Sequence, residues 1–261
     1  MRLVRYQKPG QPPTQGWLYN ELVGPLEGQL TGEFRRMEAN LPLKEVRLLA
    51  PVLPSKIICV GRNYVAHAKE HNVEVPEAPL LFLKPPSSVI GPETPISLPP
   101  QSAQVEHEAE LVIVIGQRGR WITPQNALTH VLGYTLANDV TARDLQRKDG
   151  QWTRAKGFDT FCPLGPWIDT DFDPSDALIT CHVNGDMRQM GSTRDMVFSV
   201  RQLIAYASTV MTLEPGDVIL TGTPSGVGPL APGDVVEVAI EGLGALRNPV
   251  EANQSYESPK S

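Results

Sequence analysis

The sequence has few cysteines, no long apolar run and no cluster of basic residues, and each absence excludes a class of protein. Only three cysteines occur in 261 residues, far apart and odd in number, at Cys59, Cys162 and Cys181. This pattern fits neither a disulfide framework nor the paired cysteines of a zinc site. We therefore expect three reduced thiols that pack inside the protein.

No stretch of the chain approaches the roughly 18 consecutive apolar residues that a membrane-spanning helix needs. The first ten residues, MRLVRYQKPG, also lack the apolar region of a signal peptide. Acidic residues outnumber basic ones by 29 to 23, and no run of lysine and arginine forms the stripe that nucleic acid requires. The composition predicts a cytoplasmic protein that binds neither membranes nor nucleic acid.

Several common catalytic motifs are missing as well. The chain contains no Gly-x-Ser-x-Gly elbow, no Walker lysine, no Gly-x-Gly-x-x-Gly after an apolar strand and no His-Glu-x-x-His. These motifs mark serine hydrolases, nucleotide-binding loops, dinucleotide-binding folds and zinc proteases. Chemistry of those four kinds is therefore not expected.

What the chain does contain is 25 prolines and 22 glycines, scattered along its length. Between them recur short apolar runs bounded by Gly, Pro, Asn or Asp, namely KIICVG, PLLFLK, ELVIVIG, LGYTLAN, LITCHVNG, GDVILTG and GDVVEVAI. Such runs are typical of strands joined by turns. Helical spacing is present only at residues 63–70, 123–132 and 200–212. The predicted fold class is mainly β with few helices (α+β).

The distribution of prolines also indicates how the chain is divided. Pro51 and Pro54 interrupt any regular element in the segment APVLPSK. We therefore predict a small N-terminal domain at residues 1–53, a larger domain at 54–250 and a flexible tail at 251–261.

Three glutamates at alternate positions precede an apolar strand in the segment QVEHEAELVIVIG. Alternation places Glu106, Glu108 and Glu110 on one face of that strand. Crowded carboxylates repel one another, and a divalent cation such as Mg²⁺, Mn²⁺ or Ca²⁺ is the usual reason for such crowding. An acidic strand that faces solvent has the same pattern, so the segment alone leaves both interpretations open.

A second polar segment, LANDVTARDLQRK, places the end of a strand at Asp139 and the start of a helix after it. Thr141 and Asp144 have the spacing of a capping box. Arg143 would then lie in the first helical turn, where the helix dipole disfavours a cation unless an anion compensates. That anion is either a substrate carboxylate, with Gln146 beside it at i+3, or Asp139 or Asp144 in an ordinary structural ion pair.

Five segments of the chain resemble, in order, the motifs of the fumarylacetoacetate hydrolase family: RNYVAHAKE, HEAELVIVIG, NDVTARDLQ, AKGFDTFCPLGPW and LTGTPSGVG. The resemblance spans about residues 54–248, and the first fifty residues resemble the small accessory domain of some bacterial members. It implies a mixed β-sandwich roll for the large domain and a homodimer assembled through it.

The resemblance implies a metal site formed by the Glu-x-Glu pair and the Asp of the Asn-Asp pattern. Here these residues are Glu108, Glu110 and Asp139. Three carboxylates suit Mg²⁺ or Mn²⁺ and leave positions open for a chelating 2-oxo acid. Glu106 departs from the ligand pattern, and we assign it to the strand surface.

The resemblance also implies catalytic residues on a lid helix. His67 and Glu70 have i,i+3 spacing, so the carboxylate can orient the imidazole while His67 takes a proton from water or from a substrate carbon. A lone histidine on a helix is otherwise a surface residue, and we interpret the other four in that way: His71, His107, His130 and His182.

Further family positions complete the predicted site. Lys156 matches a lysine that stabilises developing enolate charge, and Thr223 matches a residue that contacts the substrate carboxylate together with Arg143 and Gln146. Lys84, in FLKPP, lies in another recurrent family stretch but is left outside this set.

The resemblance implies an enzyme that acts through an enolate on a small 2-oxo or 2-hydroxydienoic acid. Our preferred prediction is a 2-hydroxyhepta-2,4-diene-1,7-dioate isomerase-like activity in aromatic catabolism. The alternatives are an acylpyruvate or fumarylpyruvate hydrolase and an oxaloacetate decarboxylase or tautomerase. A non-catalytic metal-binding structural protein is the alternative of another class, and the retention of every catalytic position argues against it.

Overall fold

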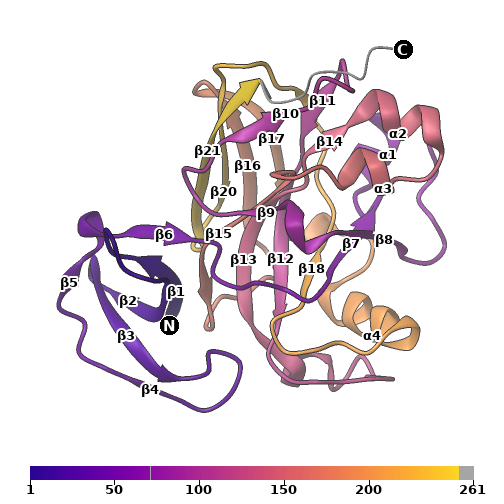
Figure 1. Ribbon diagram of the computed structural model, residues 1–261. Helices are drawn as coiled ribbons and strands as arrows, with labels where there is room; N and C mark the ends of the chain where they lie inside the picture. The colour runs from indigo at the N-terminus through magenta and orange to yellow at the C-terminus, as the bar shows by residue number, and fades with distance from the viewer. Residues whose placement is uncertain (71, 253–261) are drawn as a thin grey trace.

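The computed structural model describes residues 1–70 and 72–252 and consists mostly of strands, as predicted (Figure 1). The largest sheet has 13 strands. They are β1 (Arg2–Gln7), β2 (Thr14–Tyr19), β3 (Leu22–Gly28), β4 (Phe34–Arg36), β5 (Leu41–Pro42), β6 (Arg47–Leu49), β7 (Ile57–Gly61), β8 (Leu80–Lys84), β9 (Val89–Ile90), β12 (Ala109–Ile115), β13 (Val131–Asn138), β15 (Cys162–Asp169) and β18 (Val218–Leu220). Its main path runs β4–β3–β2–β1–β15–β13–β12–β18–β7–β8.

Two smaller sheets complete the β structure of the described residues. The second sheet has the order β10–β21–β20–β16–β17, with β10 (Ile96–Leu98), β16 (Leu178–Val183), β17 (Asp186–Ser192), β20 (Val235–Ile240) and β21 (Gly244–Ala252). The third has the order β14–β11–β19, with β11 (Val105–His107), β14 (Thr141–Ala142) and β19 (Gly228–Pro229).

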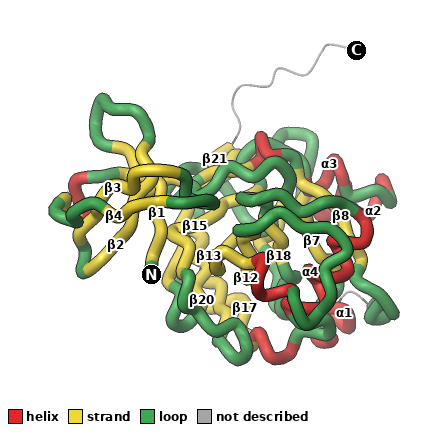
Figure 2. The backbone as a smooth tube through the Cα atoms, turned by 90° about the horizontal axis from the view of Figure 1, so that it is seen from below, coloured by secondary structure: helices red, strands yellow, loops and turns green. Residues whose placement is uncertain are grey.

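Helices are short and lie mainly at the end of the molecule opposite the N-terminal strands, as the two perpendicular views show (Figures 1 and 2). The α-helices are α1 (Val65–Glu70), α2 (Arg143–Asp149), α3 (Thr153–Lys156) and α4 (Val200–Val210). The 3-10 turns are η1 (Leu43–Glu45), η2 (Pro86–Ser88), η3 (Ala127–His130) and η4 (Thr193–Asp195). Among the described residues, no helix is both long and apolar enough to span a membrane.

Two of the three predicted helices are present, and the third is not. Helix α1 begins two residues later than predicted, and α4 ends at Val210 rather than at 212. The segment 123–132 forms only the single turn η3, because β13 already begins at Val131 and leaves no length for an α-helix.

The continuous apolar sequence of β12 reflects burial on both of its faces. Leu111 and Ile113 belong to a core shared with the second sheet and with α4. Val112 and Val114 belong to a core on the opposite face, which also contains Leu30 from the connection between β3 and β4. Strand β12 is therefore anchored on both sides, which gives the adjoining carboxylates a rigid support.

The first strand of the chain is hydrogen-bonded to the large sheet rather than separate from it. In the antiparallel pairing of β1 with β15, Leu3 lies opposite Ile168. At the other end of the chain, Glu251 and Ala252 belong to β21, where Ala252 pairs with Leu98 of β10. The rest of the predicted tail, 253–261, lies outside the described residues.

The three cysteines are free and buried, as expected from their number and spacing. Burial raises the pKa of Cys162 to about 12 and that of Cys181 to about 12. These thiols are therefore protonated at neutral pH and act as packing groups.

Candidate metal centre and active site

Glu108, Glu110 and Asp139 come together because β12 and β13 are antiparallel neighbours. Ala109 at the start of β12 lies opposite Asn138 at the end of β13. The residues that flank these two positions therefore lie at the same end of the strand pair. Their carboxylate oxygens lie within 4.8 Å of one another, and all three side chains are buried.

The strand expected to carry three alternating glutamates is interrupted at the middle one. Glu108 lies between β11 and β12, which belong to different sheets. Its N–H donates to Asn138 Oδ1 over 2.9 Å, and its carbonyl accepts from Asp139 N over 2.8 Å. The last residue of β13 and the residue that follows it therefore hold the Glu108 backbone in place.

Two buried lysines bind the carboxylate cluster. Lys156 Nζ donates to Glu108 Oε2 over 2.8 Å and to Asp139 Oδ2 over 2.6 Å. Lys84 Nζ donates to Asp139 Oδ1 over 2.6 Å and to the Val140 carbonyl over 3.1 Å. Lys84 stands outside the predicted site. Alternation along β8 places it on the same face as Phe82, which lines the cavity.

Arg143 is held by the protein's own carboxylates. Its Nε donates to Glu106 Oε2 over 2.7 Å, and its Nη1 donates to Gln146 Oε1 over 2.6 Å. Its Nη2 contacts Glu108. The assignment of Glu106 to the strand surface is therefore wrong, since this residue is only 6% exposed and is paired with Arg143.

The predicted capping box is also wrong. Helix α2 has Ala142 at its N-cap with no side-chain hydrogen bond. The Thr141 hydroxyl instead donates to the Asp139 carbonyl over 2.9 Å, and the Asp144 carboxylate accepts from Ser102 Oγ over 2.6 Å. Both side chains hold neighbouring loops in place, so Arg143 obtains its compensating anion from Glu106 and Glu108 rather than from Asp139 or Asp144.

The charges of the cluster give its carboxylates different proton affinities. Burial acts to raise the pKa of Glu108, but the charges of Lys156 and Arg143 outweigh it and hold this pKa well below its ordinary value. For Glu110, burial and the charges of Asp139 and Glu108 raise the pKa well above its ordinary value. Glu110 accepts a hydrogen bond from Gly222 N over 2.7 Å but has no lysine or arginine partner among the described residues.

These residues fit a divalent cation. Four buried carboxylates (Glu106, Glu108, Glu110 and Asp139) face three buried cations (Lys84, Arg143 and Lys156), which leaves one negative charge when all are ionised. Each carboxylate oxygen that accepts from a lysine or arginine keeps a second lone pair. An all-oxygen donor set of this kind suits Mg²⁺ or Mn²⁺.

His67 and Glu70 form the predicted pair on α1. His67 Nδ1 lies 3.2 Å from Glu70 Oε2, and the other Glu70 oxygen accepts from Gly226 N over 3.0 Å. Burial lowers the pKa of His67, although the nearby carboxylates of Glu108 and Glu70 oppose this shift. The other predicted surface histidines include one error, because His107 is fully buried; His71 lies outside the described residues.

Thr223 is fixed by a buried amide that sequence reasoning missed. Its hydroxyl donates to the Ala109 carbonyl over 2.9 Å and accepts from Gln189 Nε2 over 2.7 Å. Gln189 Oε1 lies 2.9 Å from His107 Nδ1 and accepts from Ala109 N over 3.0 Å. No local sequence signal marks Gln189, which reaches the site from β17 of the second sheet.

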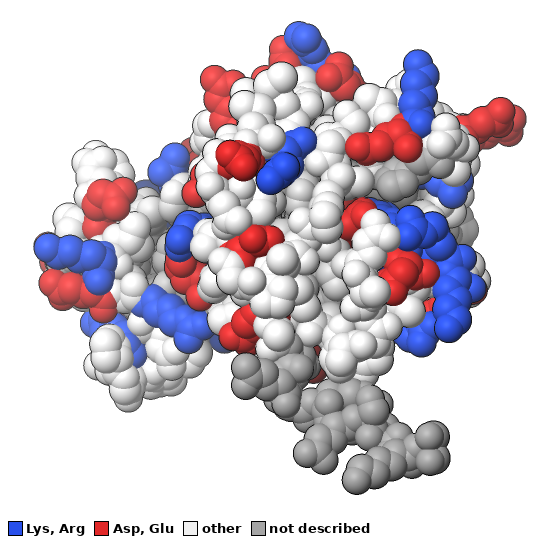
Figure 3. Space-filling view, turned by 90° about the horizontal axis from the view of Figure 1, so that it is seen from above, with Lys and Arg blue, Asp and Glu red and all other residues white. Residues whose placement is uncertain are grey.

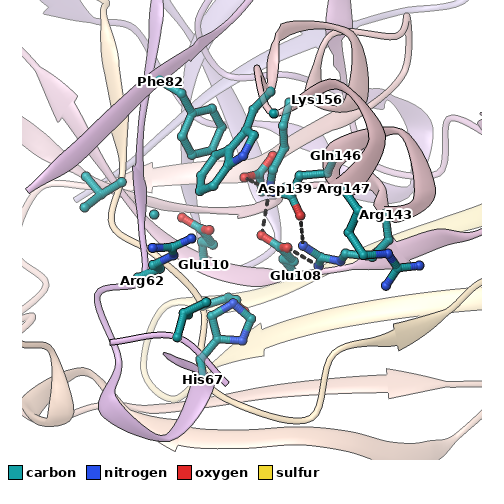
Figure 4. Close-up of a pocket in the computed structure, with 16 residues that line it drawn as sticks. Arg62, His67, Phe82, Glu108, Glu110, Asp139, Arg143, Gln146, Arg147 and Lys156 are labelled. Atoms are coloured by element: carbon teal, nitrogen blue, oxygen red, sulfur yellow. Dashed lines mark hydrogen bonds and ion pairs between the residues drawn. The ribbon is translucent and has the colours of Figure 1, made fainter. Parts of the chain in front are cut away.

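The predicted residues surround one cavity of about 360 Å³ (Figure 4). Eight of the nine line it directly: His67, Glu108, Glu110, Asp139, Arg143, Gln146, Lys156 and Thr223. The ninth, Glu70, reaches it through His67. The structure thus brings together cation-binding oxygens, a histidine base and several positive charges.

Comparison with known proteins agrees with this arrangement. Residues 56–251 match the family model described as fumarylacetoacetate (FAA) hydrolase C-terminal, and residues 1–51 match the Rv2993c-like N-terminal model. The mitochondrial oxaloacetate tautomerase of Xenopus laevis is 51% identical over 223 residues, which cover 80% of this chain and 70% of that protein.

Two solved structures extend the comparison to the whole chain. A structure described as 2-hydroxyhepta-2,4-diene-1,7-dioate isomerase from Mycobacterium marinum has a TM-score of 0.89 at 43% identity, covering 98% of this chain and 100% of its own. Maleylpyruvate hydrolase from Sphingobium sp. SYK-6, solved with manganese(II) and pyruvate, has a TM-score of 0.80 at 33% identity, covering 97% and 100%. The chain therefore belongs to the fumarylacetoacetate hydrolase family of enzymes.

Proposed function

We propose that the protein is a divalent-metal-dependent isomerase that moves a proton, through an enolate, on a small dicarboxylic 2-oxo acid. The observation that carries this proposal is one cavity that holds both the Glu108–Glu110–Asp139 cluster and His67. The likeness to an oxaloacetate tautomerase and to a 2-hydroxyhepta-2,4-diene-1,7-dioate isomerase supports it, because both of those names describe proton shifts next to a 2-oxo group.

Glu108, Glu110 and Asp139 would hold the cation, which we expect to be Mg²⁺ or Mn²⁺. When bound, a divalent cation supplies Lewis-acid stabilisation of negative charge on the substrate oxygens. Lys156 lies against Glu108 and Asp139, so its ammonium adds a second positive charge where the enolate oxygen would develop.

His67 is placed to act as the base. The contact between His67 Nδ1 and Glu70 favours the tautomer whose proton is on Nδ1, which makes Nε2 the basic nitrogen. Because burial lowers its pKa, the imidazole is neutral at neutral pH and can take a proton from the carbon beside the 2-oxo group. Return of that proton to the oxygen or to a conjugated carbon completes the isomerisation.

Arg143 and Gln146 would hold the substrate carboxylate. A guanidinium has five N–H donors, and three of those of Arg143 are engaged by Glu106, Glu108 and Gln146, so two remain. Basic side chains also gather on the face above α2 and α3 (Figure 3), where Arg147, Lys148 and Arg154 are exposed. This local charge would steer an anion to a protein whose net charge is -6.

The test is turnover by metal-stripped protein before and after addition of Mg²⁺ or Mn²⁺. The substrates are enol-oxaloacetate and 2-hydroxyhepta-2,4-diene-1,7-dioate, followed by enol absorbance and by deuterium uptake at carbon 3. We expect activity to return with the metal and to be lost in Glu110→Gln, which keeps the side-chain shape. Glu214→Gln, at a partly exposed position outside the cavity, is the matched control. Metal-independent turnover, or full activity in Glu110→Gln, would contradict the proposal.

Hydrolysis of a carbon–carbon bond in an acylpyruvate is the second candidate. The His67–Glu70 pair is also suited to activate water, and the likeness to maleylpyruvate hydrolase favours this reaction. Release of pyruvate from an acylpyruvate would select it over isomerisation, and release of CO₂ from oxaloacetate would select decarboxylation. Absence of both turnover and metal binding would instead favour a non-catalytic protein.

A further inference from the structure

Arg62 lines the same cavity as the carboxylate cluster, but its side chain does not interact with the cluster. Across the described residues, no hydrogen bond or ion pair engages its guanidinium. Its backbone has a φ of 60°, in the left-handed region that favours glycine and disfavours residues with a Cβ. An arginine that is kept in a strained conformation at a cavity wall, with no partner of its own, indicates a functional constraint.

The backbone on both sides of Arg62 is fixed. Gly61 pairs with Leu80 in the β7–β8 ladder. The Asn63 side chain accepts from Phe198 N over 2.7 Å and donates to the Thr221 carbonyl over 2.8 Å. These contacts hold both neighbours in place, so the left-handed turn is part of the fold and determines where the Arg62 side chain begins.

The other cations of the cavity are already engaged. Lys156 binds Glu108 and Asp139, and Arg143 binds Glu106 and Glu108. Arg147 donates to Gln104 Oε1 over 2.5 Å. Among the described arginines and lysines that line the cavity, Arg62 is therefore the one whose side chain makes neither a hydrogen bond nor an ion pair.

Arg62 and Arg143 lie on opposite sides of the glutamates in the close-up view (Figure 4). A 2-oxo acid held at the cluster by its first carboxylate and its 2-oxo oxygen would place that carboxylate beside Arg143. A second carboxylate on the same substrate needs a cation on another wall, and a guanidinium binds a carboxylate through two parallel hydrogen bonds.

We propose that Arg62 is a specificity-determining residue that binds the distal carboxylate of a dicarboxylic substrate. This inference rests on the proposed function for the identity of the bound group. It predicts that Arg62 contributes to the affinity for dicarboxylic acids and contributes nothing to that for monocarboxylic analogues.

The experiment compares malate with lactate as ligands of the Mn²⁺-loaded protein by titration calorimetry. Both present a carboxylate and a 2-hydroxyl group, and only malate has a second carboxylate. In Arg62→Gln, we expect the Kd of malate to rise about tenfold to a hundredfold, the effect of losing a charge-assisted hydrogen bond, while the Kd of lactate stays constant. Arg62→Lys should recover part of the affinity. Arg118→Gln, at an exposed position, controls for the change in net charge.

Arg62→Gly separates this role from a structural one. Glycine relieves the left-handed backbone, so the variant should melt at or above the wild-type temperature and still lose its preference for malate. Equal weakening of malate and lactate, or no change in either, would overturn the proposal, and so would a wild-type protein that binds neither acid. The titration measures binding and requires no turnover. A wild-type protein without isomerase activity would therefore refute the proposed function, while the malate and lactate titrations would still decide the role of Arg62.

Discussion

Lys84 and Asp139 form a buried ion pair in which both side chains are at most 1% exposed. We predict that Lys84→Met destabilises the metal-free protein by about 3–5 kcal/mol, because it removes one of the two lysines that pair with the buried Asp139 carboxylate. Urea unfolding of the metal-free variant measures this loss, with Lys44→Met at an exposed position as the control. A loss no larger than that of the control would contradict the prediction.

The protonation of His67 should set the acid limb of the activity profile. The neutral imidazole is the active base, and burial lowers its pKa from the ordinary 6.5. Activity should therefore persist below pH 6.5 and fall only when the pH passes through that lowered pKa. A profile of kcat/KM against pH measures this limb, and His67→Gln should abolish it together with most of the activity. A limb above pH 6.5 would refute this assignment.

Glu106 and Lys84 are buried residues of the site that the sequence alone did not identify as buried. Glu106 is predicted at the strand surface because it departs from the family's ligand pattern, and Lys84 is left out although it lies in a recurrent family stretch. Lysine and glutamate are mostly exposed in proteins, so nothing local indicates that either is buried. Their burial depends on Arg143 and Asp139, which lie 37 and 55 positions away in the sequence. The nine predicted site residues do come together at one cavity, whereas their individual roles stay predictions.

Strand β17 contributes one side chain to the site from the second sheet. Gln189 accepts from Ala109 N and donates to Thr223 Oγ1. We predict that Gln189→Leu destabilises the protein by about 1–3 kcal/mol, because buried polar groups lose their partners, and that it raises the KM. Gln117→Leu, on the surface, is the matched control. Unchanged stability and KM would show that Thr223 holds its position without this amide.

The strand predicted to run through Glu106, Glu108 and Glu110 is interrupted at Glu108, and the sequence pattern alone does not predict this interruption. A period of two predicts that three alternating glutamates share one face. At the interruption, the Glu108 N–H donates to the side chain of Asn138, which lies 30 positions further along the chain. By contrast, the apolar run of β12 is a local signal, and its strand was predicted correctly.

At the scale of the whole molecule, the homodimer implied by the family resemblance stays a prediction. Strand β17 is an edge of the second sheet and exposes Met187 and Met190, which are 57% and 60% exposed. An open edge with exposed apolar side chains favours pairing with a second copy. We expect light scattering to give twice the chain mass of 28.5 kDa and Met190→Glu to reduce it. A wild-type mass equal to one chain would rule out the dimer.

The pairing of β1 with β15 has a consequence for how the protein melts. Leu3 and Leu30 share a core with Val112 and Leu220 of the large sheet. The N-terminal segment therefore cannot detach without exposing apolar surface of the larger domain to water. Heat should therefore disrupt both parts in one cooperative transition, with equal calorimetric and van't Hoff enthalpies. The predicted boundary at the prolines 51 and 54 would then separate two segments of the sequence that unfold together as one unit.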